Sequence, residues 1–213
     1  MESIGSLLEH TEKQINFRRR KKASASNQEP VNYIPVLWED DFCLVEIVPI
    51  ENQSFIKNQV AALAEFSEKN FDGIGFKNMF TLGAMPEPTV ERELRVEAFE
   101  LTLAGRRLPK ANQIQYESEK ILDCNTSSTK AYGFPNCIIF FNTFNNGEFV
   151  NHIWLDIKPG IPGEQRRILL NVFYDLGESY QLTLIDWNSL ELVELRDEVQ
   201  IDDYLKSFAI ENG

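Results

Sequence analysis

The sequence has few of the side chains that most often carry catalysis or bind metals. It contains only two histidines, His10 and His152, and three cysteines, Cys43, Cys124 and Cys137. The cysteines are widely spaced, and no two of them form a CxxC pair or another spacing typical of a zinc site. Because buried free cysteines behave as small apolar residues, we expect three reduced thiols and no metal site.

Motifs that bind phosphate or organise a nucleophile are also missing. Gly73 and Gly75 lie close together, but neither a GxGxxG nor a GxxxxGK[ST] pattern follows them. A cysteine–histidine nucleophile would have to use Cys137 and His152, which a hairpin across residues 145–147 would bring near each other. Such hairpin neighbours arise without catalysis, so we expect no catalytic residue and no cofactor. A hydrolase using two carboxylates from distant positions stays open as an alternative, because acidic residues are plentiful.

Long hydrophobic runs are absent as well. Before Arg18 the longest apolar run is Leu7-Leu8, which is far shorter than the core of a secretory signal. No segment approaches the ~20 apolar residues that are needed to span a bilayer. We therefore expect a cytoplasmic protein that does not enter a membrane.

Negative charge is what the sequence has in excess, and this charge is unevenly divided. The chain holds 33 acidic and 21 basic residues, a net charge of -12. Residues 1–30 carry a net charge of about +2 and residues 31–213 about −14. Apolar residues at helical spacing in 3–17 predict a short amphipathic helix, and a linker follows at 23–30. We predict a basic helical leader and linker at 1–30 and a single acidic domain at 31–213.

The leader contains an uninterrupted basic run at 18–22, directly after the predicted helix. Such a run has two functional interpretations, a nucleic-acid patch and a targeting signal. It includes no aromatic residue, and the acidic remainder of the chain would repel phosphates. We therefore interpret it as the solvated end of the leader helix and expect no nucleic-acid partner.

The spacing of apolar residues predicts both helices and strands. Helical spacing after Ser54, a candidate N-cap, predicts a helix over 54–69. Residues 90–104 fit a strand with a bulge or a helix capped by Gly105, and we prefer the strand. Further strands are predicted at 42–50, 79–83, 137–141, 149–157, 167–174, 180–187 and 190–195, and a last helix at 199–208. The predicted fold is α+β, an antiparallel β-meander sheet packed by two or three helices, with an N-terminal helical arm.

Acidic side chains concentrate toward the C-terminus, where Arg196 is the only basic residue between positions 168 and 205. If the predicted strands form one sheet, their outward positions and turns form a strongly negative surface. Such a surface serves either solubility or the binding of a basic partner. The candidate partner-binding residues are Asp175, Glu178, Glu191, Glu194, Asp197, Glu198, Asp202 and Asp203.

A series of short motifs runs through residues 134–208. It begins with Gly133-Phe134-Pro135, an aromatic-rich run to Phe144 and the turn Asn145-Asn146-Gly147, and it ends with residues 175–180, residues 184–186, an acidic segment and residues 204–208. In this order the motifs resemble the SUKH-type immunity proteins of bacterial toxin systems. The resemblance covers about a third of the chain, and the first 130 residues have no counterpart in it. It implies an acidic protein that binds a basic toxin, often a nuclease, and blocks its active site or substrate groove.

These observations predict a non-enzymatic cytosolic binding protein, with neutralisation of a basic toxin as its specific form. Opposite net charges would speed association with such a partner and would favour it over partners that are not basic. Two alternatives remain, a carboxylate-dependent hydrolase and a structural or assembly protein that docks through its N-terminal helix.

Overall fold

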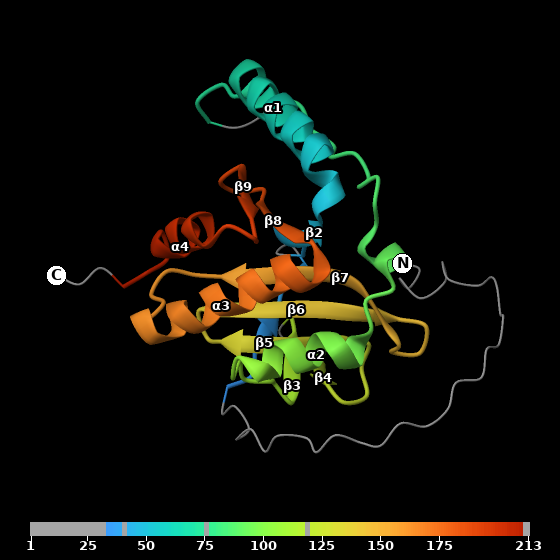
Figure 1. Cartoon of the computed structure of the whole chain (residues 1–213). Coiled ribbons are helices and arrows are strands. Elements are labelled where there is room, and N and C mark those ends of the chain that lie inside the picture. Colours follow the sequence, from blue (N-terminus) through green and yellow to red (C-terminus); the bar gives the residue numbers. More distant parts are fainter. Residues whose placement is uncertain (1–32, 40–41, 75–76, 118–119, 211–213) are drawn as a thin grey trace.

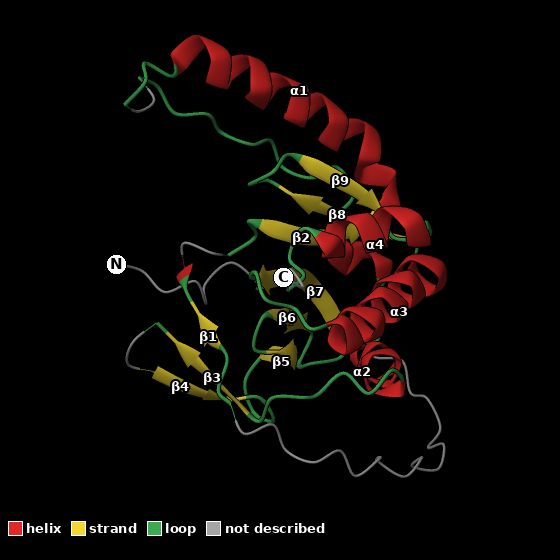
Figure 2. Cartoon of the chain, turned by 90° about the vertical axis from the view of Figure 1, so that its left-hand side faces the viewer, coloured by secondary structure: helices red, strands yellow, loops and turns green. Residues whose placement is uncertain are grey.

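A six-stranded sheet lies at the centre of the computed structural model, which describes residues 33–39, 42–74, 77–117 and 120–210. Helices cover one face of this sheet, and a smaller three-stranded sheet lies on the other side (Figure 1, Figure 2). The predicted α+β class is therefore confirmed. The predicted leader helix, basic run and linker at 1–30 fall outside the described residues.

The main sheet joins strands from distant parts of the chain, and every neighbouring pair in it is antiparallel. Five of the predicted strands are confirmed, with ends that differ by a few residues. Strand β2 lies in the middle of the sheet, although it comes first in the sequence. In spatial order the strands are β5 (Thr129–Phe134), β6 (Cys137–Phe144), β7 (Phe149–Ile157), β2 (Val45–Pro49), β8 (Leu182–Asp186) and β9 (Glu191–Glu194).

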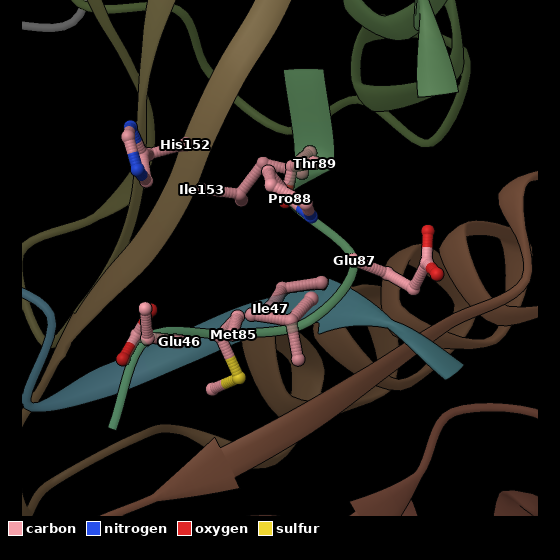
Figure 3. A pocket seen from close by; sticks show the side chains of 10 residues that line it. Glu46, Ile47, Met85, Glu87, Pro88, Thr89, His152 and Ile153 are labelled. Carbon is pink, nitrogen blue, oxygen red and sulfur yellow. The ribbon is translucent and has the colours of Figure 1, made fainter. Parts of the chain in front are cut away.

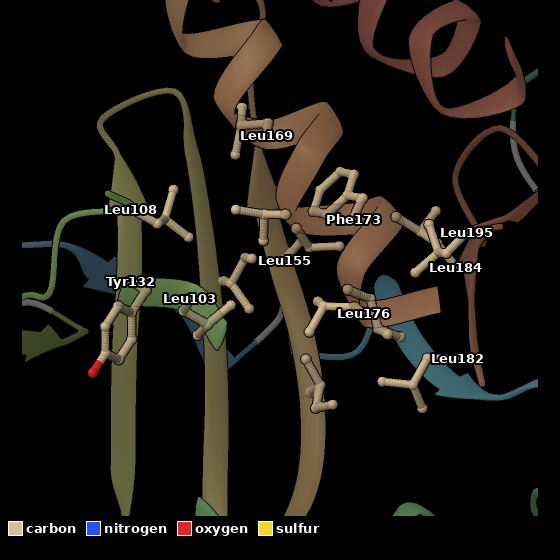
Figure 4. Packing of buried hydrophobic residues seen from close by; sticks show 14 of the residues in the cluster. Leu103, Leu108, Tyr132, Leu155, Leu169, Phe173, Leu176, Leu182, Leu184 and Leu195 are labelled. Atoms are coloured by element: carbon tan, nitrogen blue, oxygen red, sulfur yellow. The ribbon is translucent and has the colours of Figure 1, made fainter. Parts of the chain in front are cut away.

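The strand predicted at 167–174 is wrong, because these residues belong to helix α3 (Gly163–Tyr180). Strand β2 is antiparallel to both β7 and β8, so β7 and β8 run parallel to each other. Parallel strands require a crossover connection, and α3 provides it. The predicted meander is therefore interrupted between β7 and β8. The buried apolar residues of α3 are Leu169, Val172, Phe173 and Leu176, which follow a helical spacing. Figure 4 shows Leu169, Phe173 and Leu176 between α3 and the strands of the sheet.

The preferred strand at 90–104 is also wrong, and the helical alternative is correct from Val96 onward. Residues Val96–Gly105 form helix α2. Phe99 and Leu103 are fully buried, whereas Leu101 is 61% exposed. A strand would place positions 99, 101 and 103 on the same face, while a helix turns position 101 away from the other two.

Helices α2 and α3 pack with α4 (Glu198–Lys206) over the main sheet, so the predicted last helix is confirmed. The packing is closest at Gly177 of α3. A Cβ atom at this position would lie 2.1 Å from the carbonyl oxygen of Leu195. Only glycine lets the helix approach the chain after β9 at this distance.

The opposite face of the main sheet carries two separate covers. One is the small sheet, in which β3 pairs in parallel with β1 and antiparallel with β4. It packs over Ala131, Ile138, Phe140 and Trp154 of the main sheet. Its strands are β1 (Val36–Leu37), β3 (Gln113–Tyr116) and β4 (Lys120–Asp123).

The second cover is a projection that we call the finger, residues 53–74 and 77–83. It consists of helix α1 (Gln53–Asn70), which confirms the helix predicted at 54–69, and the segment that returns beside it. Figure 2 shows α1 extending to the same side of the main sheet as the small sheet. The strand predicted at 79–83 is wrong, because the returning segment contacts helix side chains instead of a neighbouring strand. Gly83 N donates to Gln59 Oε1 at 3.2 Å, and the Phe80 ring lies 5.4 Å from that of Phe66.

Two contacts hold the base of the finger: Ile56 of α1 packs against Val48, Ile185 and Trp187 of the main sheet, and the buried amide of Asn52 joins the two ends of the finger. Asn52 ends the short 3-10 helix η2 (Ile50–Asn52) and is fully buried. Its Nδ2 donates to the carbonyl oxygen of Glu87 at 2.8 Å, and its Oδ1 accepts from the Glu87 N–H at 3.0 Å. This pair of hydrogen bonds joins the start of the finger to the chain that leaves it, just before η3 (Thr89–Arg92).

Candidate functional site

The eight acidic residues predicted to bind a partner lie on three elements at the C-terminal side of the fold. Helices α3 and α4 pack against each other, and α4 also contacts β9. The structure therefore brings the three elements that carry these acids next to one another. Two of the residues lie on α3, two on β9 and four at or within α4: Asp175 and Glu178, then Glu191 and Glu194, then Asp197, Glu198, Asp202 and Asp203.

Most of these acids already have partners within the chain. Asp175 accepts two hydrogen bonds from Arg106, at 2.5 and 2.8 Å. Asp197 caps α4 by accepting from the N–H groups of Val199 and Gln200, and its hydrogen bonds with Gln200 lower its pKa. Ion pairs hold three more of the acids: Glu194 with Arg196, Asp202 with Arg166 and Lys206, and Asp203 with Lys206.

Three of the eight acids remain without an ion pair or side-chain hydrogen bond within the described part of the chain. They are Glu178, Glu191 and Glu198. The number of acidic residues could be read from the sequence, but their ion pairs could not. Arg106 and Arg166, which pair with two of these acids, lie outside the acidic stretch 168–205. The unpaired charge of this region is therefore smaller than its composition suggests.

A pocket of about 300 Å³ lies elsewhere, at the base of the finger. Strands β2 and β7 form one side of it, and the chain that leaves the finger, residues 84–89, forms the other. Figure 3 shows Met85 next to Glu46, and His152 on the neighbouring strand β7. The side chain of Glu87 points away from the pocket (Figure 3).

Glu46 is the acidic side chain in the wall of this pocket, and strand geometry explains its position. Its neighbours Val45 and Ile47 face the helical layer, so the alternation of a strand turns Glu46 to the opposite face. Glu46 Oε1 accepts a hydrogen bond from Trp187 Nε1 at 2.9 Å, and the Cys43 thiol also donates to this carboxylate. Burial raises the pKa of Glu46, and the two hydrogen bonds oppose this shift.

The described residues provide no cationic partner for Glu46. Each ion pair in the described part of the chain involves another acid. Both hydrogen bonds to Glu46 come from neutral groups. A carboxylate that is partly removed from water and not paired is costly for a fold.

His152 lies beside Glu46 in the next strand. The register pairs Glu46 with Trp154, which places His152 one diagonal step away on the same face. The Phe42 ring lies 6.3 Å from the imidazole in an edge arrangement. Desolvation lowers the pKa of His152, so the ring stays neutral at pH 7.

The turn that precedes β2 shapes this site. Cys43 has a φ of 60°, which lies in the left-handed region that non-glycine residues seldom adopt. This conformation lies three residues before Glu46, and the Cys43 thiol contacts the Glu46 carboxylate. Burial raises the pKa of the thiol, so Cys43 donates a hydrogen bond as a neutral group.

The cysteine–histidine pair considered from the sequence is not formed. The register of β6 and β7 places Asn142 opposite His152, whereas Cys137 lies opposite Ile157. Five residues along a strand separate the two positions by roughly 17 Å. Cys137 also faces the helical layer, where burial raises its pKa.

Among the described residues, no group of three or more histidines, cysteines or carboxylates has an arrangement that would hold a metal ion. Within the same ranges, no helix is both long and apolar enough to cross a membrane. The visible sequence signal for the pocket is Glu46 itself, a charged residue in the middle of the apolar strand 42–50. Sequence reasoning passed over this signal, because charged residues in strands are common at solvent-facing positions.

No protein-family model, no curated protein and no solved structure matches this chain. The resemblance of residues 134–208 to SUKH-type immunity proteins therefore stays a prediction.

Proposed function

We propose that this protein acts by binding a basic protein partner, without catalysis of its own, through the finger and the pocket at its base. The observation that carries the proposal is the exposure of the finger. Ile56 is the only fully buried residue in the 18 residues of α1. Apolar side chains toward the outer end of the finger lie open to solvent: Phe71 at 54%, Ile74 at 98%, Met79 at 93% and Leu82 at 39%.

Exposed apolar side chains concentrated on one projection are typical of a protein-binding surface. The finger holds as many acidic as basic residues, so its net charge favours neither a basic nor an acidic partner. The remainder of residues 31–213 carries the net charge of about −14 and supports long-range attraction of a basic partner. Glu46 adds a carboxylate without a cation at the base of the finger. The specific form that we propose is an immunity protein that binds a basic toxin one-to-one.

The binding function is tested by quantitative association of the full chain with its recovered partner at low and high salt. We expect a basic partner in a one-to-one complex, with association that slows as salt rises. The double substitution Ile74→Ser and Met79→Ser should weaken this complex at least tenfold. Leu101→Ser is the matched control, because it also removes an exposed apolar side chain, but from α2. An acidic partner, or a complex that is insensitive to salt and to both finger substitutions, would overturn the proposal.

A hydrolase that uses Glu46 is the second candidate, and the raised pKa of this carboxyl in a pocket is the observation that favours it. A protonated Glu46 would serve as a general acid and neutral His152 as a general base. Glu87 does not complete a carboxylate pair, because its side chain points away (Figure 3). Hydrolysis of an ester, glycoside or phosphate probe that Glu46→Gln abolishes without unfolding would favour this candidate over binding alone.

A further inference from the structure

Two acidic residues lie in the main sheet away from bulk solvent, and they have very different surroundings. Asp186 is 4% exposed and accepts hydrogen bonds from Tyr204 Oη at 3.0 Å, Asn188 N at 2.8 Å and Ser189 N at 3.3 Å. These bonds fix the turn after β8 and join it to α4, so Asp186 has a structural role. Among the described residues, Glu46 accepts hydrogen bonds only from Trp187 and Cys43, and it lies in the wall of a pocket.

The pocket beside Glu46 is suited to a long side chain with an apolar stem. Val48 and Met85 line it on the same face of the main sheet as Glu46, and they pack in one apolar cluster with Trp187. The Glu46 carboxylate and the neutral His152 imidazole lie on this same face, on the neighbouring strands β2 and β7. Lysine and arginine side chains match a pocket that combines apolar side chains with a carboxylate. Their methylene stems pack on apolar surface, and their cationic heads donate hydrogen bonds to an acceptor.

We propose that this pocket receives a lysine or arginine side chain of the basic partner, with its stem against Met85 and its cationic head on the Glu46 carboxylate. The inference rests on the proposed binding function and deepens it by naming the anchor. Anchor residues that fill a pocket near the centre of an interface dominate many protein complexes, and arginine is enriched among them. The head group would supply the cation that the described part of this chain does not supply to Glu46.

The surrounding groups favour a cation over other head groups. A carboxylate is an acceptor, so an incoming carboxylate or phosphate would be repelled. His152 is neutral and presents no competing positive charge. Trp187 and Cys43 hold the Glu46 carboxylate in place from the side of the protein, which leaves acceptor capacity for a ligand.

The inference is tested by NMR titration of the full chain with N-acetyl-arginine amide, with N-acetyl-lysine amide, and with N-acetyl-citrulline amide, which is the neutral match of the arginine probe in shape. The indole N–H signal of Trp187 reports on Glu46, to which it is hydrogen-bonded. We expect saturable shifts with the cationic probes at roughly millimolar affinity, as befits ligands of this size. The citrulline probe should bind at least tenfold more weakly.

Two variants separate a specific site from general attraction. Glu46→Gln keeps the shape of the side chain and should reduce binding of the arginine probe at least tenfold. Glu178→Gln removes the same charge from an unpaired site on α3 and should leave binding unchanged. Equal binding of citrulline and arginine overturns the inference even if Glu46→Gln does not fold. If Glu46→Gln and Glu178→Gln lose the same affinity for the arginine probe, the inference is also overturned, because the probe would then be attracted by the net charge of the protein and not by this pocket.

The recovered protein partner distinguishes failure of this inference from failure of the proposed function. A basic partner that binds Glu46→Gln as tightly as the original chain overturns the pocket anchor and leaves the binding function in place. A partner that is acidic overturns the binding function, while the probe titration still decides whether the pocket prefers a cation.

Discussion

The finger and the main sheet use their apolar side chains in opposite ways. In the main sheet and its helices, Phe99, Ile139 and Phe173 are completely buried and belong to one continuous core. In the finger, Ile74 and Met79 are almost completely exposed. Burial of apolar surface is the main source of stability, so the main sheet maintains the fold, while the finger depends on a few contacts at its base. The finger is therefore the region whose apolar surface is available to a partner.

The largest expected effect lies on the main-sheet side, at Gly177. A methyl group there would collide with the Leu195 carbonyl, so Gly177→Ala should reduce the free energy of unfolding by about 3 kcal/mol. Urea unfolding measures this loss. Gly163→Ala, at the start of the same helix, meets no atom within 4 Å and is the matched control. If the two variants were equally stable, the close packing described for α3 would be incorrect.

A smaller effect is expected at the base of the finger. Asn52→Ala leaves both main-chain groups of Glu87 without their buried partner, which should cost about 2 kcal/mol. Hydrogen exchange should then accelerate in α1 while β6 and β7 keep their protection. Asn58→Ala, which removes an exposed amide from α1, should change neither the free energy of unfolding nor the hydrogen exchange of α1. Uniform acceleration across the chain would show that the finger and the main sheet unfold together.

Glu46→Gln should raise stability, and the effect should depend on pH. The ordinary pKa of a glutamate is 4.5, and burial raises that of Glu46 in the folded chain. Its contribution to stability is therefore present below pH 4.5 and is lost as pH rises through the higher folded pKa. Glutamine does not titrate, so the variant should match the original chain at pH 4 and melt a few degrees higher at pH 8.

The neighbouring titratable groups Cys43 and His152 are the same in both proteins, so their contributions should largely cancel in this comparison. Thermal unfolding at several pH values measures the difference in Tm. If the difference in Tm between the two proteins became smaller as pH rises, the burial of Glu46 would be contradicted. If the difference became larger, the fold would be keeping a carboxylate that destabilises it, which is common for residues that bind a ligand or partner.

The smallest effect is expected at the outer end of the finger. The pair Ile74→Ser and Met79→Ser removes side chains that are 98% and 93% exposed, so stability should stay within about 0.5 kcal/mol. Phe99→Ala in the core should instead cost about 3 kcal/mol, as much as the change at Gly177. Urea unfolding compares the two. A large loss for the finger pair would mean that these side chains support the fold and are not free for a partner.

Sequence reasoning succeeded where a pattern was long and local. The nine-residue strand β7 was predicted with its observed ends, and the helix at 54–69 differs from α1 by one residue at each end. The prediction was wrong where a short apolar run fits both the spacing of a strand and the spacing of a helix. At 167–174 the apolar residues are nearly continuous, so a strand pattern matches them as well as a helical one. Only the crossover from β7 to β8 requires the helix there.

The candidate site was harder to predict than the fold. His152 was recognised as the one histidine available in the predicted domain, but its neighbour Glu46 was not connected to it. The two residues are brought together by the pairing of β2 with β7, which no local pattern encodes. Likewise, the pairing of Asp175 with Arg106 joins α3 to α2 across 69 positions.

The sequence by itself determined the α+β class, the acidic character and most strands, because composition and short-range periodicity depend only on neighbouring residues. The tertiary structure alone decided that β2 lies between β7 and β8, that residues 96–105 form a helix and that a pocket forms beside Glu46. Each of these depends on contacts between segments far apart in the chain. Such contacts are selected by the burial of a shared core, and no single segment contains that information.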